Sequence, residues 1–423
     1  MTARPTSATE AGAGQSVVSV PVDAPLVTRP FVALAVATLA FFVSGGIVLP
    51  VAPRFASGPL AADALGFGIS IAAFSIAALL ARPIVGWASD RYGRRPLLII
   101  GAGVTIAALL LHVVTTDLVV FTIARAGLGI GEGFFFVAAL AAGSDMAPES
   151  RRGEAISFLS LSLYMGVVVG PFVGEIVLDQ GGFDLVWLVA AAMAGVALLL
   201  TFLVPETAPA RTAQGVEVVG GAAAPSAGRA RLFHPKGLLP GLIILAGAWG
   251  MSGFFTFLPF YADDVGLDGA ALPLAVYGLI VIALRVVGAR LPDRVGAPRL
   301  SGVAMVVAAV GLTLIAVLQT PVGLLAGTAV YATGVAFLFP AVLSCAVGLV
   351  PASERGSVLG TTSAFLDVGF GIGPVVLSLL VVEAAGSASY ATVFIVCAVV
   401  AGLGALLLAT RRRDLTPTVA SAG

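Results

Sequence analysis

The chain has 423 residues, of which 59% are hydrophobic and only 10% are charged. Ordinary globular domains are roughly 25% charged, so this composition excludes a typical soluble domain and predicts an integral membrane protein. The formal net charge is +0, which gives no guide to partners where charge is sorted by membrane side.

Residues 1–28 are rich in Ala, Ser, Thr and Pro and lack an apolar core, which predicts a disordered cytoplasmic tail and not a signal peptide. Apolar runs of about 20 residues follow, each long enough to cross a hydrocarbon layer of ~30 Å. They contain Gly and Ala throughout and do not alternate, which argues against a membrane β-barrel. We therefore expect an all-α membrane protein with twelve transmembrane helices, at about 31–52, 66–88, 97–115, 118–142, 155–178, 185–204, 238–261, 270–290, 300–319, 322–347, 356–382 and 389–410.

Positive residues predict the orientation, because Lys and Arg are held on the cytoplasmic side during insertion. With the N-terminus inside, eighteen of the 22 Lys+Arg fall in the tails and cytoplasmic loops. Both termini are thus expected to be cytoplasmic. The excess of Arg over Lys, with abundant Ala, Gly and Val, indicates a GC-rich bacterial genome and hence a bacterial inner membrane. Cys345 and Cys397 lie in apolar runs and imply neither a disulfide nor a metal site.

The longest polar connection, residues 206–236, divides the runs into two sets of six. We expect an N-terminal six-helix bundle at 29–205, a cytoplasmic linker at 206–236, a C-terminal bundle at 237–410 and a cytoplasmic tail at 411–423. An ungapped offset of 203 residues relates the halves: Arg82 maps to Arg285, and Gly166, Gly170 and Pro171 map to Gly369, Gly373 and Pro374. Two parallel repeats are typical of transporters that rock their halves about a central site.

The stretch GWASDRYGRRP, residues 86–96, joins the second and third runs. It reads at least in part as a positive cytoplasmic loop with a tight turn at Gly93. Its pattern also resembles the cytoplasmic-loop signature of the major facilitator superfamily. The resemblance implies two pseudo-symmetric six-helix bundles around a central cavity, and charge contacts of Asp90 and Arg91 that lock the outward-facing state. We place Gly86, Gly93, Arg94 and Arg152 in the same predicted gate. For the repeat-related Arg82 and Arg285 we expect a shared structural part near the cytoplasmic mouth.

The fifth run contains GVVVGPFVG, residues 166–174. Glycines four apart let helices approach closely and proline bends a helix, so packing alone is one interpretation. The stretch also resembles the antiporter signature of the superfamily at Gly166, Gly170, Pro171 and Gly174, and LPVAP at 49–53 resembles its drug:proton antiporters. These resemblances imply export in exchange for protons.

Run four places Arg125 and Glu132 among apolar residues. The stretch RAGLG resembles the fourth-helix motif R-x-x-Q-G, with Leu128 in place of glutamine, and that motif is associated with proton transfer. An ionised carboxylate inside a membrane normally faces a water-filled cavity or a partner. Glu132 is therefore either a proton or substrate site or the structural partner of Arg125.

Two further acids fall within apolar runs. Asp367, near the middle of run eleven, is either a proton-coupling residue or a helix-packing hydrogen-bond acceptor. Glu175, near the outer end of run five, is either proton-coupling or merely interfacial.

Aromatic residues gather on the runs that line the cavity in this family. As cavity residues we select Phe41, Phe135, Phe136, Trp249, Phe255, Tyr331 and Phe337. Asn is absent from the chain and polar side chains are few there, which favours a largely apolar ligand over a sugar.

We expect a secondary transporter that exports a hydrophobic or amphipathic small molecule by proton antiport. The alternatives are a proton-coupled importer on the same fold and a non-transporting membrane sensor or scaffold. The sequence offers no nucleophile-base pair, metal cluster or phosphate loop, so we expect no enzyme, no metal and no cofactor beyond the proton gradient. The expected partners are a small-molecule substrate, protons and lipids, not nucleic acid, with the protein a monomer.

Overall fold

A computed structural model describes residues 26–148, 151–207, 234–288, 291, 295–350, 354–384 and 387–415. This part of the chain is almost entirely helical, which confirms the all-α class. Ten of its helices are long and apolar enough to cross a membrane, and α7 is a shorter apolar helix. The exact number of spans stays a prediction. Most of the expected tail 1–28 and linker 206–236, and the end of the tail 411–423, lie outside the described residues.

In the N-terminal half, side-chain caps begin α1, α2 and α4. Asp63 accepts a hydrogen bond from the Gly66 backbone N–H at 2.8 Å, and Asp117 caps the next helix but one in the same way. Gly182, at φ 69, interrupts the longest helix between two apolar stretches. The helices are α1 (Arg29–Ser57), α2 (Ala64–Tyr92), α3 (Arg94–Val113), α4 (Leu118–Met146) and α5 (Arg152–Thr201).

The C-terminal half repeats this order and adds a small hairpin. Its helices are α6 (Pro235–Asp264), α7 (Ala271–Val287), α9 (Ala297–Val317), α10 (Pro321–Gly348), α11 (Arg355–Ser378), α12 (Ala391–Thr410) and the short η3 (Arg412–Leu415). Strand β1 (Val382–Ala384) pairs antiparallel with β2 (Ser387–Ser389). The sequence did not predict these strands. The expected run 356–382 ends as helix at Ser378, ahead of a short polar stretch that contains Glu383 and Ser387.

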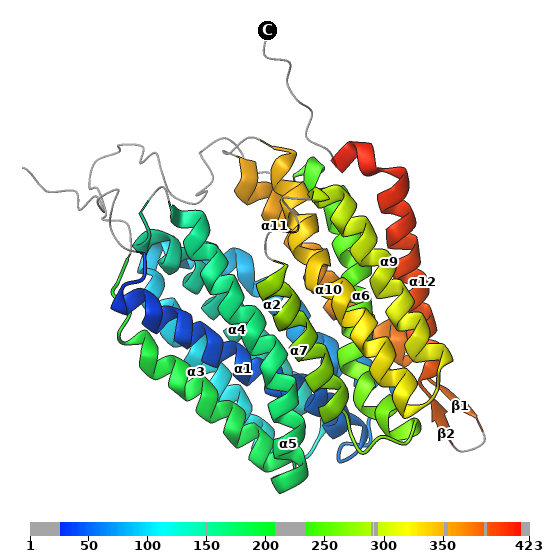
Figure 1. Ribbon diagram of the computed structural model, residues 1–423. Helices are drawn as coiled ribbons and strands as arrows, with labels where there is room; N and C mark the ends of the chain where they lie inside the picture. The colour runs from blue at the N-terminus through cyan, green and yellow to red at the C-terminus, as the bar shows by residue number, and fades with distance from the viewer. Residues whose placement is uncertain are drawn as a thin grey trace, which may run out of the picture.

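The helices form two bundles that lie side by side (Figure 1). Helices α1 to α5 pack on one another, and α6 to α12 do the same. The bundles meet where α2 contacts α11, where α5 contacts α7, and where α1 contacts α6. We call the first two contacts the α2–α11 seam and the α5–α7 seam.

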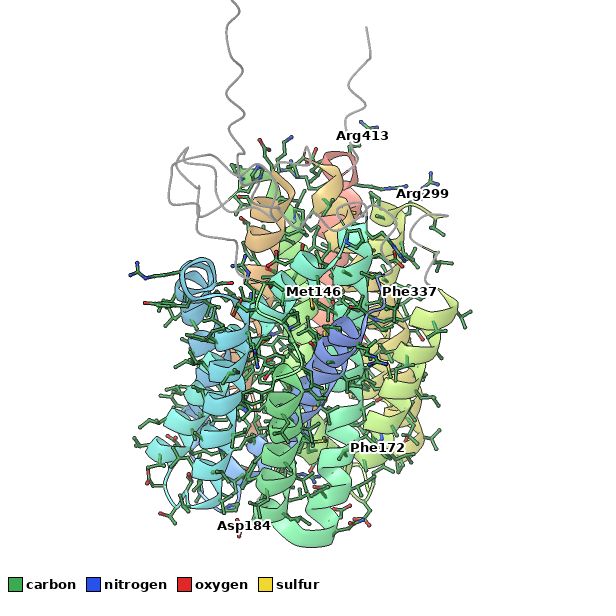
Figure 2. The ribbon with its side chains drawn as sticks, turned by 90° about the vertical axis from the view of Figure 1, so that its left-hand side faces the viewer. Met146, Phe172, Asp184, Arg299, Phe337 and Arg413 are labelled. Carbon is green, nitrogen blue, oxygen red and sulfur yellow. The ribbon has the colours of Figure 1, made fainter. Side chains whose placement is uncertain are left out.

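The two ends of the molecule differ in charge. Arg299 and Arg413 project at one end, here called the basic end, and Asp184 lies at the opposite end (Figure 2). Helix α12 finishes at the basic end, and the β hairpin lies at the other (Figure 1). This distribution agrees with the sidedness expected from the arginines, although orientation in a membrane stays a prediction.

Glycine brings α1 and α5 into close contact. A Cβ atom at Gly46 would lie 2.8 Å from the Gly166 carbonyl oxygen and 3.0 Å from the Gly170 Cα. At Gly373, the repeat counterpart of Gly170, a Cβ would lie 2.8 Å from the Ser252 Oγ of α6. The glycines of the antiporter-like motif therefore have a packing role in both halves.

The offset of 203 residues also relates the two seams, since it maps α2 onto α7 and α5 onto α11. In the α2–α11 seam, a Cβ at Gly371 would lie 3.7 Å from the Ser75 Cβ. The equivalent pair in the α5–α7 seam is Val168 and Gly278, where the Cβ would lie 2.7 Å from the Val168 Cγ1. The sequence repeat is thus a repeat of contacts.

Candidate functional site

An ion pair joins the two halves in the α2–α11 seam, away from the helix ends. Arg82 Nη2 donates a hydrogen bond to Asp367 Oδ1 at 3.0 Å, and Nη1 lies 2.5 Å from Oδ2. The Asp367 side chain is 11% exposed and the Arg82 side chain 22%. Arg82 also lies 6.0 Å from the ring centroid of Phe136 on α4. This two-point contact fixes one helix of each half against the other.

Glu132 on α4 lies near this pair. It lies within electrostatic range of both Arg82 and Asp367. Within the described residues it makes no ion pair. One guanidinium therefore has two carboxylates within its electrostatic range and is paired with the one from the other half.

Arg125 is not the partner of Glu132. Seven residues of helix separate them by about 10 Å along the axis, because each residue rises ~1.5 Å. Arg125 is 5% exposed, its Nη2 donates to the Ile71 carbonyl oxygen at 3.4 Å, and its guanidinium lies 5.3 Å from the Phe74 ring centroid. The structural-pair interpretation of Glu132 is thus wrong for this state. A proton-coupling role for either residue stays a prediction.

The repeat-related arginine makes a different contact at the same place in the other seam. Arg285 on α7 lies over the ring of Tyr164 on α5, with 3.7 Å from guanidinium carbon to ring centroid. Tyr164 and Asp367 are themselves related by the offset of 203. Tyr164 is not selected by the sequence, because tyrosine carries no charge at neutral pH, although the offset applied to Asp367 points to it.

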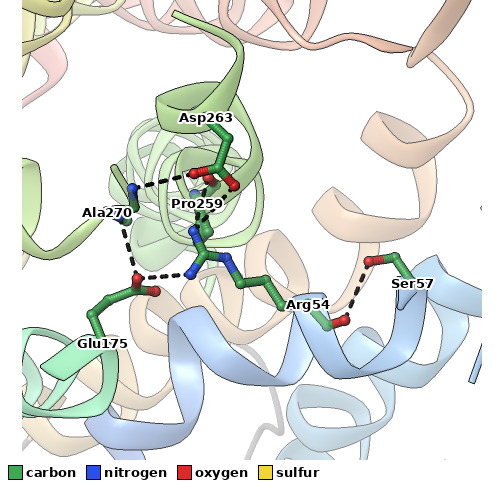
Figure 3. A network of polar contacts seen from close by, with 7 residues as sticks. Arg54, Ser57, Glu175, Pro259, Asp263 and Ala270 are labelled. Carbon is green, nitrogen blue, oxygen red and sulfur yellow. Dashed lines mark hydrogen bonds and ion pairs between the residues drawn. The ribbon is translucent and has the colours of Figure 1, made fainter. Parts of the chain in front are cut away.

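Glu175 belongs to a polar network between the halves (Figure 3). The network lies beside the C-terminal ends of α1 and α6, at the end opposite the basic end. Arg54 Nη1 on α1 donates to Glu175 Oε2 at 2.9 Å, and Nη2 donates to the Pro259 carbonyl oxygen at 3.1 Å and lies 3.4 Å from Asp263 Oδ2 on α6. The Ala270 backbone N–H donates to Glu175 Oε2 at 3.3 Å. The Glu175 side chain is 0% exposed and takes part in an ion pair, and both a proton-coupling role and an interfacial position stay predictions.

The comparisons with known proteins agree with this architecture. The family model described as Major Facilitator Superfamily matches residues 34–374 and 270–422. The chain belongs to the major facilitator superfamily. An uncharacterized MFS-type transporter of Salmonella typhimurium, STM4428, is 26% identical over 377 residues, covering 87% of this chain and 92% of that protein.

Solved structures share the fold. The nucleoside transporter NupG superposes with a TM-score of 0.71 at 16% identity, over 90% of this chain and 99% of that one. A D-xylose-proton symporter gives a TM-score of 0.72 at 16% identity, over 89% and 96%. Proteins of this superfamily are membrane transporters and not enzymes, typically act as monomers on small molecules, and need no cofactor. This chain is therefore a multi-pass transporter, and its bacterial relatives indicate the inner membrane.

The superfamily loop signature is partly described. Gly93 ends α2 at φ 95, and its N–H donates to the Ser89 carbonyl oxygen at 3.2 Å. Arg94 Nε donates to Asp145 Oδ2 at 3.0 Å and Nη1 to the Ser89 carbonyl oxygen at 2.7 Å, so these contacts of Arg94 stay within one half. Arg91 lies 5.6 Å from the ring centroid of Tyr92.

Three residues of the predicted gate, Gly86, Asp90 and Arg152, occupy described helix positions, but their burial and contacts lie outside the described part. The role of the whole gating set stays a prediction. The same holds for antiport by the Gly166, Gly170, Pro171 and Gly174 motif, in which Gly174 packs directly on the Ile47 backbone.

The predicted cavity aromatics fall into two groups in this superfamily fold. Phe41 stacks on Phe135 with ring centroids 4.0 Å apart, and these two, with Phe255 and Tyr331, are buried core residues in this state. Phe136, Trp249 and Phe337 are half-buried and remain candidates to line a cavity. A pocket of about 610 Å³ lies near Lys236 and Arg411, and none of these three aromatic residues lines it. The central cavity therefore stays a prediction.

Proposed function

We propose that this transporter exports an amphipathic small molecule in exchange for protons, with both termini cytoplasmic. The observation that carries the proposal is the Arg82–Asp367 ion pair between the halves, with Glu132 in electrostatic range of the same arginine. A buried ion pair whose acid takes up a proton leaves its partner without a counter-ion. Protonation is thus coupled to the contact that ties α2 to α11.

In this proposal, proton uptake is coupled to movement of the halves because Arg82 changes its carboxylate partner. With Asp367 ionised, Arg82 holds α11 and the halves stay joined along the α2–α11 seam. When Asp367 takes up a proton, the charge of Arg82 is balanced by Glu132 in its own half, and the tie between halves weakens. A proton thereby shifts the relative stability of two states, as an effector must.

The state described here supports this cycle. The Arg54–Glu175–Asp263 network and the contact of Phe67 with Phe257 join the halves at the end opposite the basic end. If the basic end is cytoplasmic, this is a state closed to the outside, with Asp367 paired and its proton released inward. Substrate then binds from the cytoplasm, and the contacts at the outer end open. A proton from outside next displaces the substrate, which leaves the cell.

The direction of substrate transport relative to the proton is tested in proteoliposomes that contain the purified protein. Trapped pyranine reports the internal pH. An antiporter accumulates its substrate when the lumen is acidic and makes the lumen more alkaline as it does so. A symporter accumulates it only when the outside is acidic. Accumulation under the second gradient alone contradicts the proposal and favours the importer alternative.

A further inference from the structure

We propose that Arg285, stacked on Tyr164 in the α5–α7 seam, binds the anionic group of the substrate, so that the transported molecule is an amphipathic organic anion. This inference rests on the proposed transport function and adds the substrate class. It begins from the repeat, which places Arg285 where Arg82 lies in the other seam.

The surroundings of the two arginines differ in their acidic residues. Arg82 is paired with Asp367 and in range of Glu132. The offset of 203 maps Asp367 to Tyr164 and Glu132 to Val335, and neither counterpart can supply a negative charge at neutral pH. Both acids that balance the first arginine are therefore replaced beside the second.

Arg285 makes no ion pair within the described residues, and its Nε is buried without a hydrogen-bond partner. A guanidinium on an aromatic ring gains some stabilisation, but the ring does not neutralise its charge. Charged groups inside a membrane protein that lack a protein partner generally mark a substrate or ion pathway. The substrate supplies the negative charge that pairs with Arg285.

Geometry agrees with this role. The stacked face of the guanidinium is taken by Tyr164, which leaves the N–H edge to donate two parallel hydrogen bonds to a carboxylate. Both side chains are half-buried. The half-buried Phe337 on α10 packs at Gly288, one turn beyond Arg285, and offers apolar surface for the rest of the molecule.

The seam location links binding to the transport cycle. Arg285 comes from one half and Tyr164 from the other, so an anion that draws the guanidinium off the ring breaks a contact between halves. Substrate then acts on the α5–α7 seam as the proton acts on the α2–α11 seam. The Arg82–Asp367 contact thus responds to the proton, and the Arg285–Tyr164 contact responds to the substrate.

The test compares 2-naphthoate with 2-naphthamide, which match in size and differ in charge, by calorimetric binding to the purified full chain in nanodiscs at neutral pH. We expect the wild type to bind naphthoate at least tenfold more tightly than naphthamide. Arg285→Gln should remove this preference by weakening naphthoate about tenfold while leaving naphthamide unchanged, and Arg285→Lys should keep part of it. Equal affinities in the wild type, binding of neither compound, or a preference that survives Arg285→Gln would overturn the proposal.

A second variant guards against loss of fold. Tyr164→Asp keeps Arg285 and recreates the ion pair of the other seam, so it should abolish the naphthoate preference with the melting temperature maintained or raised. If the preference persists in Tyr164→Asp, the anion does not bind at Arg285. Because this is an equilibrium measurement without a pH gradient, its failure is distinct from failure of proton antiport, which the proteoliposome assay reports.

Discussion

The α2–α11 seam and the α5–α7 seam have the same construction and different chemistry. Both cross a helix of one half with a helix of the other, both pack a glycine against the facing helix, and both place an arginine at the same height. One arginine meets Asp367 and the other meets Tyr164. The repeat thus preserved the place of the contact, while its chemistry differs between an ion pair and a cation–π contact.

The same asymmetry appears at the end opposite the basic end. Arg54 and Glu175 form an ion pair in the N-terminal half, while the offset maps them to Phe257 and Ser378. Phe257 is 1% exposed and packs on Phe67 of α2. At this end the ion pair of the N-terminal repeat thus has neutral counterparts in the C-terminal repeat.

The largest expected effect is that of Asp367→Asn, which breaks the charged seam directly. The change leaves Arg82 without its ion-pair partner, a loss that costs about 3–5 kcal/mol where a pair is buried. Transport driven by a pH gradient should fall to background in proteoliposomes, and the melting temperature should drop. Asp367→Glu, which keeps the charge, should retain part of both. Full transport by Asp367→Asn would contradict a role for the charged α2–α11 seam in proton coupling.

Glu132→Gln should have the next largest effect, on coupling and not on stability. Glu132 makes no ion pair within the described residues, so its loss breaks no tie between halves. We expect accumulation against a pH gradient to fall about tenfold with an unchanged melting temperature, and Glu132→Asp to be milder. A large fall in melting temperature with normal coupling would instead make Glu132 a structural residue.

Glu175→Gln should open the end opposite the basic end. Ser378, its repeat counterpart, is 2% exposed and lies against Gly68, so Ser378→Cys is a reporter of opening there. Adding Glu175→Gln should speed its labelling by a membrane-impermeant maleimide about fivefold, because Arg54 loses a charged partner. Asp184→Asn, at an exposed acid on the same end, is the control and should change nothing. Unchanged labelling in Glu175→Gln would mean that the network does not hold this end closed.

The smallest expected effect is on stability, and it comes from adding one methyl group to a glycine in each seam. A Cβ at Gly278 would approach the Val168 Cγ1 to 2.7 Å, whereas one at Gly371 has no neighbour nearer than 3.5 Å. Gly278→Ala should therefore cost about 1–3 kcal/mol, as overpacking does. Gly371→Ala should be neutral in a thermal-shift assay. Equal melting temperatures for the two variants would show that the α5–α7 seam adjusts freely.

The sequence by itself determined the class, the family and the internal repeat. Long apolar runs predict helices that span a membrane because an unpaired backbone is too costly in lipid, and a constant offset between motifs survives without any coordinates. It also selected Glu132, Asp367 and Glu175 as the acids to examine. These conclusions depend on composition and spacing, which are local or periodic properties of the chain.

Only the tertiary structure decided which charges meet. Arg82 and Asp367 are 285 residues apart, and Arg54 and Glu175 are 121 apart, so no periodicity connects them. Arg125 and Glu132, which the spacing suggested as a pair, are held apart by the rise of their own helix. Which side chains pair depends on which faces of the helices are turned toward each other in the packed bundles. Close contacts at glycines such as Gly46 and Gly170 help to set these faces, although the glycines themselves are far from the charged residues in the sequence.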